Sequence, residues 1–496
     1  MSTTVSTTEI LVDPSGERLA DVLARQRAAH RRDGIPDLET RLSRIDRLAL
    51  AILEHVDEIV EALDADFGNR PALASLRSDI IGGVSEAEYL RAHLEEWMRP
   101  SASQAGPEMG IPVTLEPRPV GVVGVIGPWN FPVGLVIQPA LEALAAGNRV
   151  MIKFSDIPER TGAVVARAVA SRLDPDEVTV VLGGRETAVA FSELPFDHLF
   201  FTGSPAVGRV VAAAAGRNLV PVTLELGGKN PVLVSAEADI AEAAARVAAA
   251  RMNNGGQLCL CPDDVYVPRA QADTFVEAYS AAIRAALPEY ATNPDAITII
   301  NDANFARVTR LLDDARARGA RVDAVPTGAG DDTLPDATTR RIAPTIVRDA
   351  TDDMLISREE IFGPVIVVRP YDDVAEVIAR IADGPHPLVA YYYGPEGTEF
   401  RRYVDETASG GVTRNDLALH LMVPDVPFGG IGTSGTGAYH GKAGFDTFSQ
   451  VRPVASPLLP FSIAQTVGAP FPEPAREEQR AQIEALRATV ASRVAR

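Results

Sequence analysis

The chain has 496 residues, and its 47 Lys and Arg against 67 Asp and Glu give a formal net charge of −20 at pH 7. With 46% hydrophobic and 23% charged residues it can bury a large core, which excludes a marginal mini-protein and disorder over most of the length. A strongly negative surface repels phosphates, so we expect no nucleic-acid partner.

Signals for export, membrane insertion and metal binding are weak. Cys259 and Cys261 are separated by one residue, which is too close for an ordinary disulfide. The segment Met1 to Pro14 has no Lys or Arg, unlike a signal peptide, so we expect a cytoplasmic protein. An uncharged run from Val120 to Leu141 is broken by Pro and Gly and predicts buried elements instead of a membrane span. The 7 histidines show no paired spacing, which predicts no metal site.

In chain order, the first hundred residues predict helices. Apolar residues spaced by three and four from Leu42 to Leu63 indicate one long helix that ends near Phe67. From Val120 onward, short β-branched runs alternate with Ala-rich segments, a pattern typical of a parallel sheet covered by helices on both faces. The predicted strands are Val120 to Ile126, Val150 to Lys153, Val178 to Leu182, His198 to Phe201 and Val222 to Leu224.

A second α/β series follows, and a tail closes the chain. Strands are predicted near Asp264 to Val267 and Pro364 to Arg369, with helices near Ala272 to Ala286 and Asn304 to Arg318. The polar stretch Pro326 to Thr339 predicts a surface loop within this series.

The tail from Glu473 to Arg496 predicts a helix with one apolar face, formed by Ile483, Leu486, Val490 and Val494. Because charged residues interrupt any apolar span, we expect no membrane anchor. We expect instead a stripe that docks on the same chain or on a second copy.

The first motif with chemical meaning is Gly127-Pro128-Trp129-Asn130-Phe131-Pro132, between a predicted strand and a predicted helix. An amide at the carboxyl end of a strand can donate a hydrogen bond to a developing oxyanion, and this predicts that role for Asn130. Taken alone, the motif would favour a proline-bounded turn with Asn as a helix cap.

Two strand ends supply candidate cofactor-binding residues, namely Lys153, Asp156, Gly203, Ser204 and Gly208. The lysine and the acid follow one predicted strand, where they can bind ribose hydroxyls. The glycines and the serine follow another, where exposed N–H groups suit a pyrophosphate. Because the spacing is Gly-x-x-x-x-Gly and not Gly-x-Gly-x-x-Gly, an ordinary strand-to-helix turn is the alternative.

Two further motifs supply a candidate base and a candidate nucleophile. Glu225 lies between two leucines and beside a glycine pair, so partial desolvation would raise its pKa toward that of a useful general base. A paired structural acid is the alternative. Cys259 follows a Gly-Gly turn, where a thiolate can be both favoured and accessible, and a buried inert thiol is the alternative.

Taken together, these motifs resemble the aldehyde dehydrogenase superfamily in order and over roughly Leu42 to Ser449. The segments that carry the resemblance are Pro128-Trp129-Asn130-Phe131-Pro132, Phe201-Thr202-Gly203-Ser204, Glu225-Leu226-Gly227-Gly228-Lys229, Gly256-Gln257-Leu258-Cys259, Glu360-Ile361-Phe362-Gly363-Pro364 and Pro427-Phe428-Gly429-Gly430. Asp66 to Arg70, Pro262-Asp263 and Gly437 to Lys442 look most like the class 3 and coniferyl aldehyde dehydrogenase branch.

The resemblance implies a role for each candidate. Cys259 would attack the aldehyde carbonyl, with Asn130 and the Cys259 N–H holding the oxyanion, and Glu225 would activate the water that hydrolyses the resulting thioester. The implied cofactor-binding residues are Lys153 and Asp156 at the adenosine ribose, Gly203, Ser204 and Gly208 near the pyrophosphate, and Glu360 and Phe362, with Trp129, at the nicotinamide end.

The resemblance also implies an α/β fold in several parts. These are a Rossmann-like cofactor-binding domain over residues 15–106 and 120–226, an α/β catalytic domain over 227–426, a bridging or oligomerisation element over 107–119 and 427–460, and a tail over 461–496. A homodimer is expected.

We therefore expect an aldehyde dehydrogenase that oxidises an aromatic aldehyde such as coniferyl aldehyde, or another hydrophobic aldehyde. NAD is the expected cofactor and NADP the alternative, because Asp156 stands where a longer glutamate is frequent. A catalytically silent binding protein with the same fold and a cofactor-independent Cys-Glu esterase are the competing hypotheses. Leu258 and Cys261, which flank the nucleophile, also depart from the common pattern.

Overall fold

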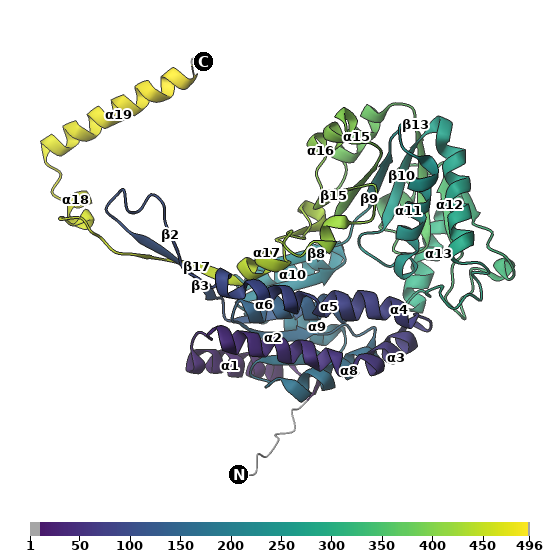
Figure 1. Ribbon diagram of the computed structural model, residues 1–496, viewed down its shortest axis with the longest axis horizontal. Coiled ribbons are helices and arrows are strands. Elements are labelled where there is room, and N and C mark those ends of the chain that lie inside the picture. The colour runs from purple at the N-terminus through teal and green to yellow at the C-terminus, as the bar shows by residue number, and fades with distance from the viewer. Residues whose placement is uncertain (1–9, 495–496) are drawn as a thin grey trace, which may run out of the picture. The chain divides into compact units, whose positions relative to one another are not determined.

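The computed structural model describes residues 10–494 (Figure 1). The prediction of a cytoplasmic location rests on the segment Met1 to Pro14, and part of that segment lies outside the described residues. So does Arg496, the last residue of the tail. The chain divides into two compact units, Met1–Met98 with Pro117–Gln450 and Arg99–Glu116 with Val451–Arg496. The domain boundaries expected from the sequence stay a prediction.

A seven-stranded sheet forms the first layer of the larger unit. Five neighbouring pairs are parallel, and only the last strand runs antiparallel to its neighbour. Its strands, in spatial order, are β1 (Leu11–Val12), β6 (Val178–Leu182), β5 (Arg149–Lys153), β4 (Val122–Ile126), β7 (His198–Gly203), β8 (Val222–Leu226) and β16 (Gly435–Thr436). The chain winds outward from β4 in both directions, so the order reverses between β4 and β7, where α/β sheets bind their ligands.

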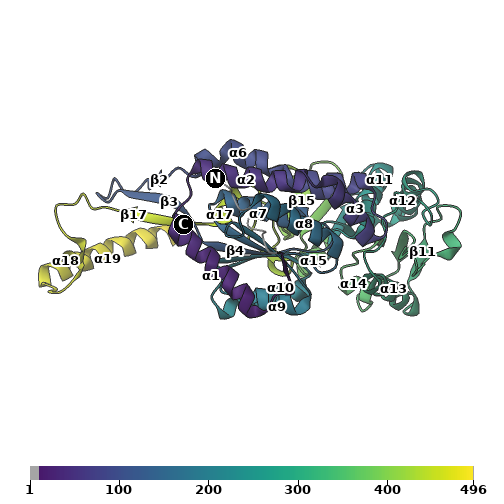
Figure 2. The ribbon, with the colours of Figure 1, turned by 90° about the horizontal axis from the view of Figure 1, so that it is seen from below.

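Helices cover both faces of this sheet, as the sequence predicted (Figure 2). One face carries α2 (Leu38–Leu53), α3 (Val56–Phe67), α6 (Glu86–Trp97), α7 (Gly134–Ala145) and α8 (Glu159–Arg172), and the other carries α1 (Gly16–Asp33), α9 (Arg185–Ser192) and α10 (Pro205–Arg217). Alternate residues of a strand face opposite layers: Val123 and Val125 pack with α2, whereas Val122 packs with α1.

The prediction of one long helix from Leu42 to Phe67 is wrong in one respect, because the segment forms two helices. α2 ends at Leu53, and His55, with φ −113° and ψ 19°, precedes the start of α3 at Val56. Neither Gly nor Pro marks this break. The short segments α4 (Ala72–Ser75), a π-helical turn (Leu76–Ile81) and α5 (Gly82–Val84) then lead to α6.

A second seven-stranded sheet follows in the same unit and is also mostly parallel. Its strands, in spatial order, are β11 (Arg321–Ala324), β12 (Thr345–Arg348), β13 (Val365–Tyr371), β10 (Pro262–Pro268), β9 (Asn230–Val234), β14 (Val389–Tyr393) and β15 (Gly411–Arg414). The edge strand β11 alone pairs antiparallel. Both strands predicted from the sequence, β10 and β13, lie at the centre.

Two groups of helices enclose the second sheet. Side chains of α11 (Ile240–Met252) and α12 (Ala272–Ala286) pack on one face together with Ile366 and Val368. Val365 and Val367 point the other way, toward α13 (Asp302–Ala317) and α14 (Leu355–Arg358). The remaining helices of this unit are α15 (Val374–Asp383), α16 (Thr398–Glu406) and α17 (Gly441–Thr447). One buried apolar cluster contains residues of both sheets, for example Val150 and Val265, so the two layers share a core.

The smaller unit contains most of a three-stranded sheet of β17 (Ser449–Ala455), β3 (Val113–Pro119) and β2 (Ser101–Ala102). It also contains α18 (Ile463–Val467) and α19 (Glu473–Val494). The helix predicted in the tail is present, and its four apolar residues are exposed by 52–82%. Between residues 10 and 494, no helix combines the length and apolar character needed to cross a membrane.

Candidate active site

Four candidate residues lie at the carboxyl edge of the first sheet. Asn130 follows β4, Lys153 ends β5, Ser204 follows β7, and Glu225 lies in β8. The four strands are neighbours and parallel, so their ends meet at one edge. This edge flanks the point where the strand order reverses, which favours ligand binding there.

The segment that carries Cys259 begins with a strained turn. Asn254, Gly255 and Gly256 all have positive φ, from 49° to 78°. A Cβ at Gly256 would stand 2.1 Å from the carbonyl oxygen of Gly363, so only glycine permits this close approach. Cys259 follows with a half-buried thiol, whereas Cys261 is buried.

Two polar side chains hold the backbone around the nucleophile. Asn230 Nδ2 donates to the carbonyl oxygens of Cys259, at 2.7 Å, and Cys261, at 3.0 Å. The Tyr391 hydroxyl donates to the carbonyl of Leu260 at 2.6 Å. The sequence analysis assigned neither residue a role. The position of Asn230 directly after the Glu225 motif could have marked it as part of the site. The sequence around Tyr391 contains no comparable motif.

Asn130 contacts the same loop. Asn130 is 4% exposed, and its side-chain Nδ2 donates to the backbone carbonyl of Gln257 at 3.1 Å. The backbone carbonyl of Asn130 in turn accepts from Asn254 Nδ2 at 3.2 Å. A carboxamide nitrogen carries two protons, so one remains for a ligand. The structure therefore brings the candidate oxyanion donor beside the cysteine loop.

Glu225 is 4% exposed, and within residues 10–494 neither carboxylate oxygen has a hydrogen-bond partner. A Cβ at Gly429 would stand 3.1 Å from Glu225 Oε1, so a glycine of the Phe428-Gly429 segment borders the carboxylate. Burial raises the pKa of Glu225 well above its ordinary value. A buried, unpaired acid of this kind is typical of a general base and not of a structural ion pair.

Cys259 lies within electrostatic reach of two carboxylates. Burial raises the pKa of its thiol, and the charges of Glu360 and Glu225 raise it further. The resting thiol is therefore uncharged at neutral pH. The candidate nucleophile Cys259, the candidate base Glu225 and the candidate oxyanion donor Asn130 therefore lie close together in the structure.

Of the candidates at the nicotinamide end, Glu360 and Phe362 precede β13 of the second sheet, whereas Trp129 follows β4 of the first sheet. Burial, followed by the charge of Asp263, raises the pKa of Glu360 to about 8. The Glu360 carboxylate accepts the N–H of Gly228 and lies so close to Gly227 that a Cβ there would stand 2.2 Å from Oε2. The Phe362 ring meets Trp129 edge to face, with 5.3 Å between centroids.

The cofactor-binding candidates of the first sheet fit a dinucleotide. Ser204 caps the N-terminus of α10, whose first N–H groups lie at the carboxyl edge of the sheet. A Cβ at Gly208 would stand 2.6 Å from the Leu226 side chain, so this helix packs tightly on β8. Lys153 is buried, and its Nζ donates to the Phe154 carbonyl at 2.7 Å, whereas Asp156 is exposed. Among the residues that the structure describes, the buried Thr202 hydroxyl has no hydrogen-bond partner, so a free polar group lies near the end of β7.

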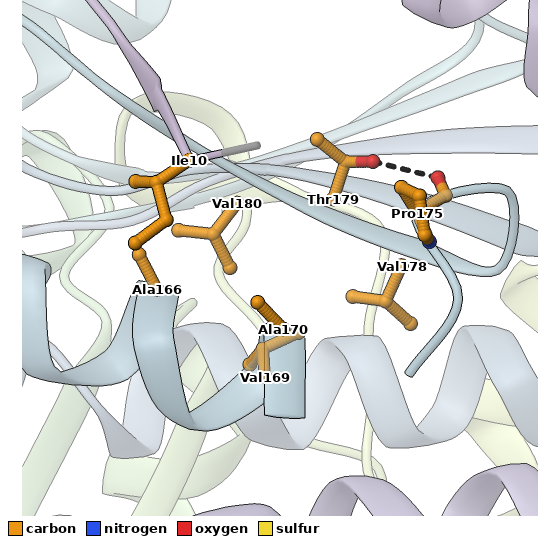
Figure 3. A pocket seen from close by; sticks show the side chains of 8 residues that line it. All are labelled: Ile10, Ala166, Val169, Ala170, Pro175, Val178, Thr179 and Val180. Atoms are coloured by element: carbon orange, nitrogen blue, oxygen red, sulfur yellow. Dashed lines mark hydrogen bonds between the residues drawn. The ribbon is translucent and has the colours of Figure 1, made fainter. Parts of the chain in front are cut away.

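A small apolar cavity lies elsewhere, between Ile10, α8 and β6 (Figure 3). Thr179 is the only polar side chain drawn there, and its hydroxyl already donates to the Pro175 carbonyl at 2.7 Å. Among the described residues that line it, the cavity offers no free polar side chain, and β6 carries none of the catalytic candidates.

Comparison with known proteins identifies the family. The model of the aldehyde dehydrogenase family matches residues 17–454. A coniferyl aldehyde dehydrogenase of Pseudomonas sp. (strain HR199 / DSM 7063) is 44% identical over 88% of this chain and 90% of its own length. A dimeric NADP-preferring aldehyde dehydrogenase of Canis lupus familiaris is 35% identical over 89% of this chain and 95% of its own.

A solved structure, described as the substrate-bound state of Staphylococcus aureus AldH, superposes with a TM-score of 0.85 and 31% sequence identity. The match covers 93% of this chain and 99% of that one. The fold expected from the sequence is thus confirmed, and the hypothesis of a catalytically silent protein is not supported. The chain belongs to the aldehyde dehydrogenase family and is an NAD(P)-dependent enzyme that oxidises aldehydes.

Proposed function

We propose that the enzyme oxidises an aromatic aldehyde of the coniferyl type, or another hydrophobic aldehyde, to the carboxylic acid by way of a Cys259 thioester. The observation that supports the mechanism is the placement of a half-buried thiol within electrostatic reach of an unpaired, buried Glu225, with the Asn130 side chain hydrogen-bonded to the loop that carries the thiol. The substrate class rests on the relative named coniferyl aldehyde dehydrogenase.

In the first step, Cys259 Sγ attacks the aldehyde carbon. The thiol proton passes to ionised Glu225, a carbon–sulfur bond forms, and the carbonyl oxygen becomes an oxyanion. The free Nδ2 proton of Asn130 and the Cys259 N–H stabilise that charge. Because Asn230 and Tyr391 fix the neighbouring carbonyls, the Cys259 N–H keeps its orientation without reorganisation.

The cofactor would be held at both ends of the site. Lys153, Asp156, Gly203, Ser204 and Gly208 bind its adenosine ribose and pyrophosphate, and the nicotinamide end contacts Glu360, Phe362 and Trp129. When bound, the nicotinamide ring supplies the hydride acceptor that the oxidation needs. Loss of hydride from the thiohemiacetal carbon leaves a thioester on Cys259.

Glu225 releases the first proton to solvent and then, ionised again, acts a second time. A water attacks the thioester carbonyl while Glu225 takes its proton, the carbon–sulfur bond breaks, and the Cys259 sulfur recovers a proton. The unpaired state of the Glu225 carboxylate supports this role, since no ion pair has to break before it accepts a proton.

We further propose NAD as the preferred cofactor and a homodimer in the cytoplasm as the working form. Asp156, at the end of β5, would accept from ribose hydroxyls and repel a 2′-phosphate. The dimer rests on the relative named as dimeric, and the location on two free cysteines, which suit a reducing compartment. Light scattering tests the dimer.

Steady-state kinetics test the proposed reaction. We expect NADH formation with coniferyl and benzyl aldehydes at a higher kcat/KM than with short aliphatic aldehydes, and a higher kcat/KM with NAD than with NADP. Ester cleavage that is indifferent to NAD, without NADH formation on any aldehyde, would contradict the proposal and favour the esterase hypothesis.

A further inference from the structure

The segment Glu360–Phe362 would carry the nicotinamide-binding groups, yet it belongs to no helix or strand. α14 ends at Arg358 and β13 begins at Val365. Phe362 has φ +50°, a conformation that costs a non-glycine residue about 1 kcal/mol or more. The position of Glu360 and Phe362 therefore depends on side chains that bind this backbone from outside.

Arg307 on α13 binds one side of the segment. Its Nη1 donates to the Glu360 carbonyl at 2.9 Å, and its Nη2 donates to the Ile361 carbonyl at 2.6 Å and to the Phe362 carbonyl at 3.4 Å. One guanidinium thus accounts for three consecutive carbonyls. The planar, rigid fork of arginine suits this arrangement, and the single ammonium of lysine cannot reproduce it.

Asp263 binds the other side. It is 1% exposed, and its Oδ2 accepts the N–H of Ile361 at 3.0 Å. Its Oδ1 accepts from the buried Arg251 at 2.6 Å, and Lys229 Nζ lies 3.4 Å from Oδ2. Asp263 lies in β10, four residues after Cys259, so its carboxylate connects the strand that follows the nucleophile with the Glu360–Phe362 segment.

We propose that Arg307 and Asp263 are positioning residues for the cofactor, which fix the Glu360–Phe362 backbone so that its side chains meet the nicotinamide end. This inference rests on the proposed function of Glu360 and Phe362. It predicts that loosening the segment weakens cofactor use while it leaves the thiol chemistry of Cys259 intact, because Asn230 and Tyr391 hold the cysteine's backbone independently.

Arg310 provides a matched control on the same helix. It lies three residues further along α13 and forms an ion pair with the side chain of Glu359 at 2.7 Å, with both side chains more than a third exposed. It donates to no carbonyl of the segment in the hydrogen bonds described. Arg310→Leu therefore removes a comparable guanidinium without removing the three backbone contacts.

The experiment compares Arg307→Leu and Arg310→Leu with the parent enzyme in two assays. We expect Arg307→Leu to raise the KM for NAD about tenfold or more, while hydrolysis of p-nitrophenyl acetate without cofactor stays within about twofold, because that reaction needs the thiol, the oxyanion donors and Glu225 but no cofactor. Arg310→Leu is expected to change neither. Arg307→Lys is expected to raise the KM for NAD about threefold to fivefold and carries the same test if the leucine variant does not fold.

Fluorescence supplies a second readout. The chain has 2 tryptophans, and Trp97→Phe leaves Trp129, whose ring touches Phe362, as the single emitter. In that background, Arg307→Leu should shift the emission of Trp129 and Arg310→Leu should not.

An unchanged KM for NAD in Arg307→Leu would overturn the inference, and so would a parallel loss of ester hydrolysis. An unaltered Trp129 spectrum in that variant would also overturn it. Failure of the proposed function looks different, because the parent enzyme itself would then form no NADH with any aldehyde.

Discussion

Glu225 and Asp264 are both buried carboxylates of the larger unit, 4% and 7% exposed, yet their surroundings differ. Asp264 lies 2.7 Å from Arg369 and 3.3 Å from Lys229. Glu225 has no hydrogen-bond partner within the part of the chain that the structure describes. Burial alone would raise the pKa of both carboxyl groups, and the presence or absence of charged partners decides the direction in which each pKa finally moves.

The two pKa values move in opposite directions. Burial opposes ionisation of Asp264, but the charges of Lys229 and Arg369 outweigh it and hold the pKa of Asp264 below its usual value. For Glu225 nothing offsets burial, and the pKa is raised. A paired buried acid thus contributes to folding, whereas an unpaired one at a sheet edge is available for proton transfer.

The largest effect is expected from a variant that keeps both carboxylates and removes the nucleophile. Cys259→Ala should lower kcat for aldehyde oxidation about 10⁴-fold or more, because no covalent intermediate can form. NADH formation measures the effect. Cys261→Ala is the control, since the Cys261 thiol is buried and faces the carbonyl of Ala250 at 3.5 Å, and it should retain most of the activity. Comparable losses in both variants would contradict the assignment of Cys259.

Removing the unpaired carboxylate should slow both steps in which Glu225 accepts a proton, and thioester hydrolysis the most. Glu225→Gln is expected to lower steady-state turnover about 10³-fold through slow thioester hydrolysis. Rapid mixing should show at most one equivalent of NADH per active site before the slow phase. Turnover of the parent enzyme should rise with pH as Glu225 loses its proton, and this rise should be absent in the glutamine variant. Full turnover without Glu225 would remove it from the mechanism.

Removing the paired carboxylate should affect stability instead. Asp264→Asn leaves Arg369 without its buried carboxylate partner, while Lys229 keeps Asp263 at 3.4 Å, and the free energy of unfolding should fall by about 3 kcal/mol. Urea denaturation measures the loss. The folded variant should keep kcat within about twofold. If Asp264→Asn lost turnover while keeping its stability, the contrast with Glu225 would be wrong.

The smallest expected effect is a difference in pH dependence between the two variants. Glu225 keeps its proton in the folded state above about pH 4.5, where the unfolded chain has lost it, so rising pH destabilises the parent enzyme through this group. Glu225→Gln should therefore gain stability relative to the parent enzyme as pH rises. The stability that Asp264 supplies is present above about pH 3.8 and is lost as pH falls through its lowered folded pKa, so the deficit of Asp264→Asn should shrink in acid. Unfolding curves at several pH values measure both trends, and parallel slopes would contradict them.

Part of the fold and part of the candidate site could be predicted from the sequence. The strands of the first sheet were predictable because β-branched runs alternate with Ala-rich helices, and parallel strands bring Asn130, Lys153 and Glu225 to one edge. The break at His55 was not predictable, since the apolar spacing of the two helices is continuous across it and no Gly or Pro interrupts it.

The supporting residues were harder to find than the reacting ones. Arg307 is one of three arginines on α13, and its three carbonyl partners lie more than fifty residues away in the chain. Arg70 and Asp79 form a buried pair at 2.7 Å, and Asp79 accepts the N–H of Val133 directly after the Asn130 motif. Such contacts depend on tertiary packing, which local patterns do not encode.

The uncharged state of the resting Cys259 thiol bears on how the enzyme survives between turnovers. Peroxides and alkylating agents attack thiolates much faster than thiols. Because burial and the two nearby acids favour the protonated thiol, we expect peroxide to inactivate the idle enzyme more slowly than it would inactivate an enzyme with a thiolate at this position, although the sulfur is partly accessible.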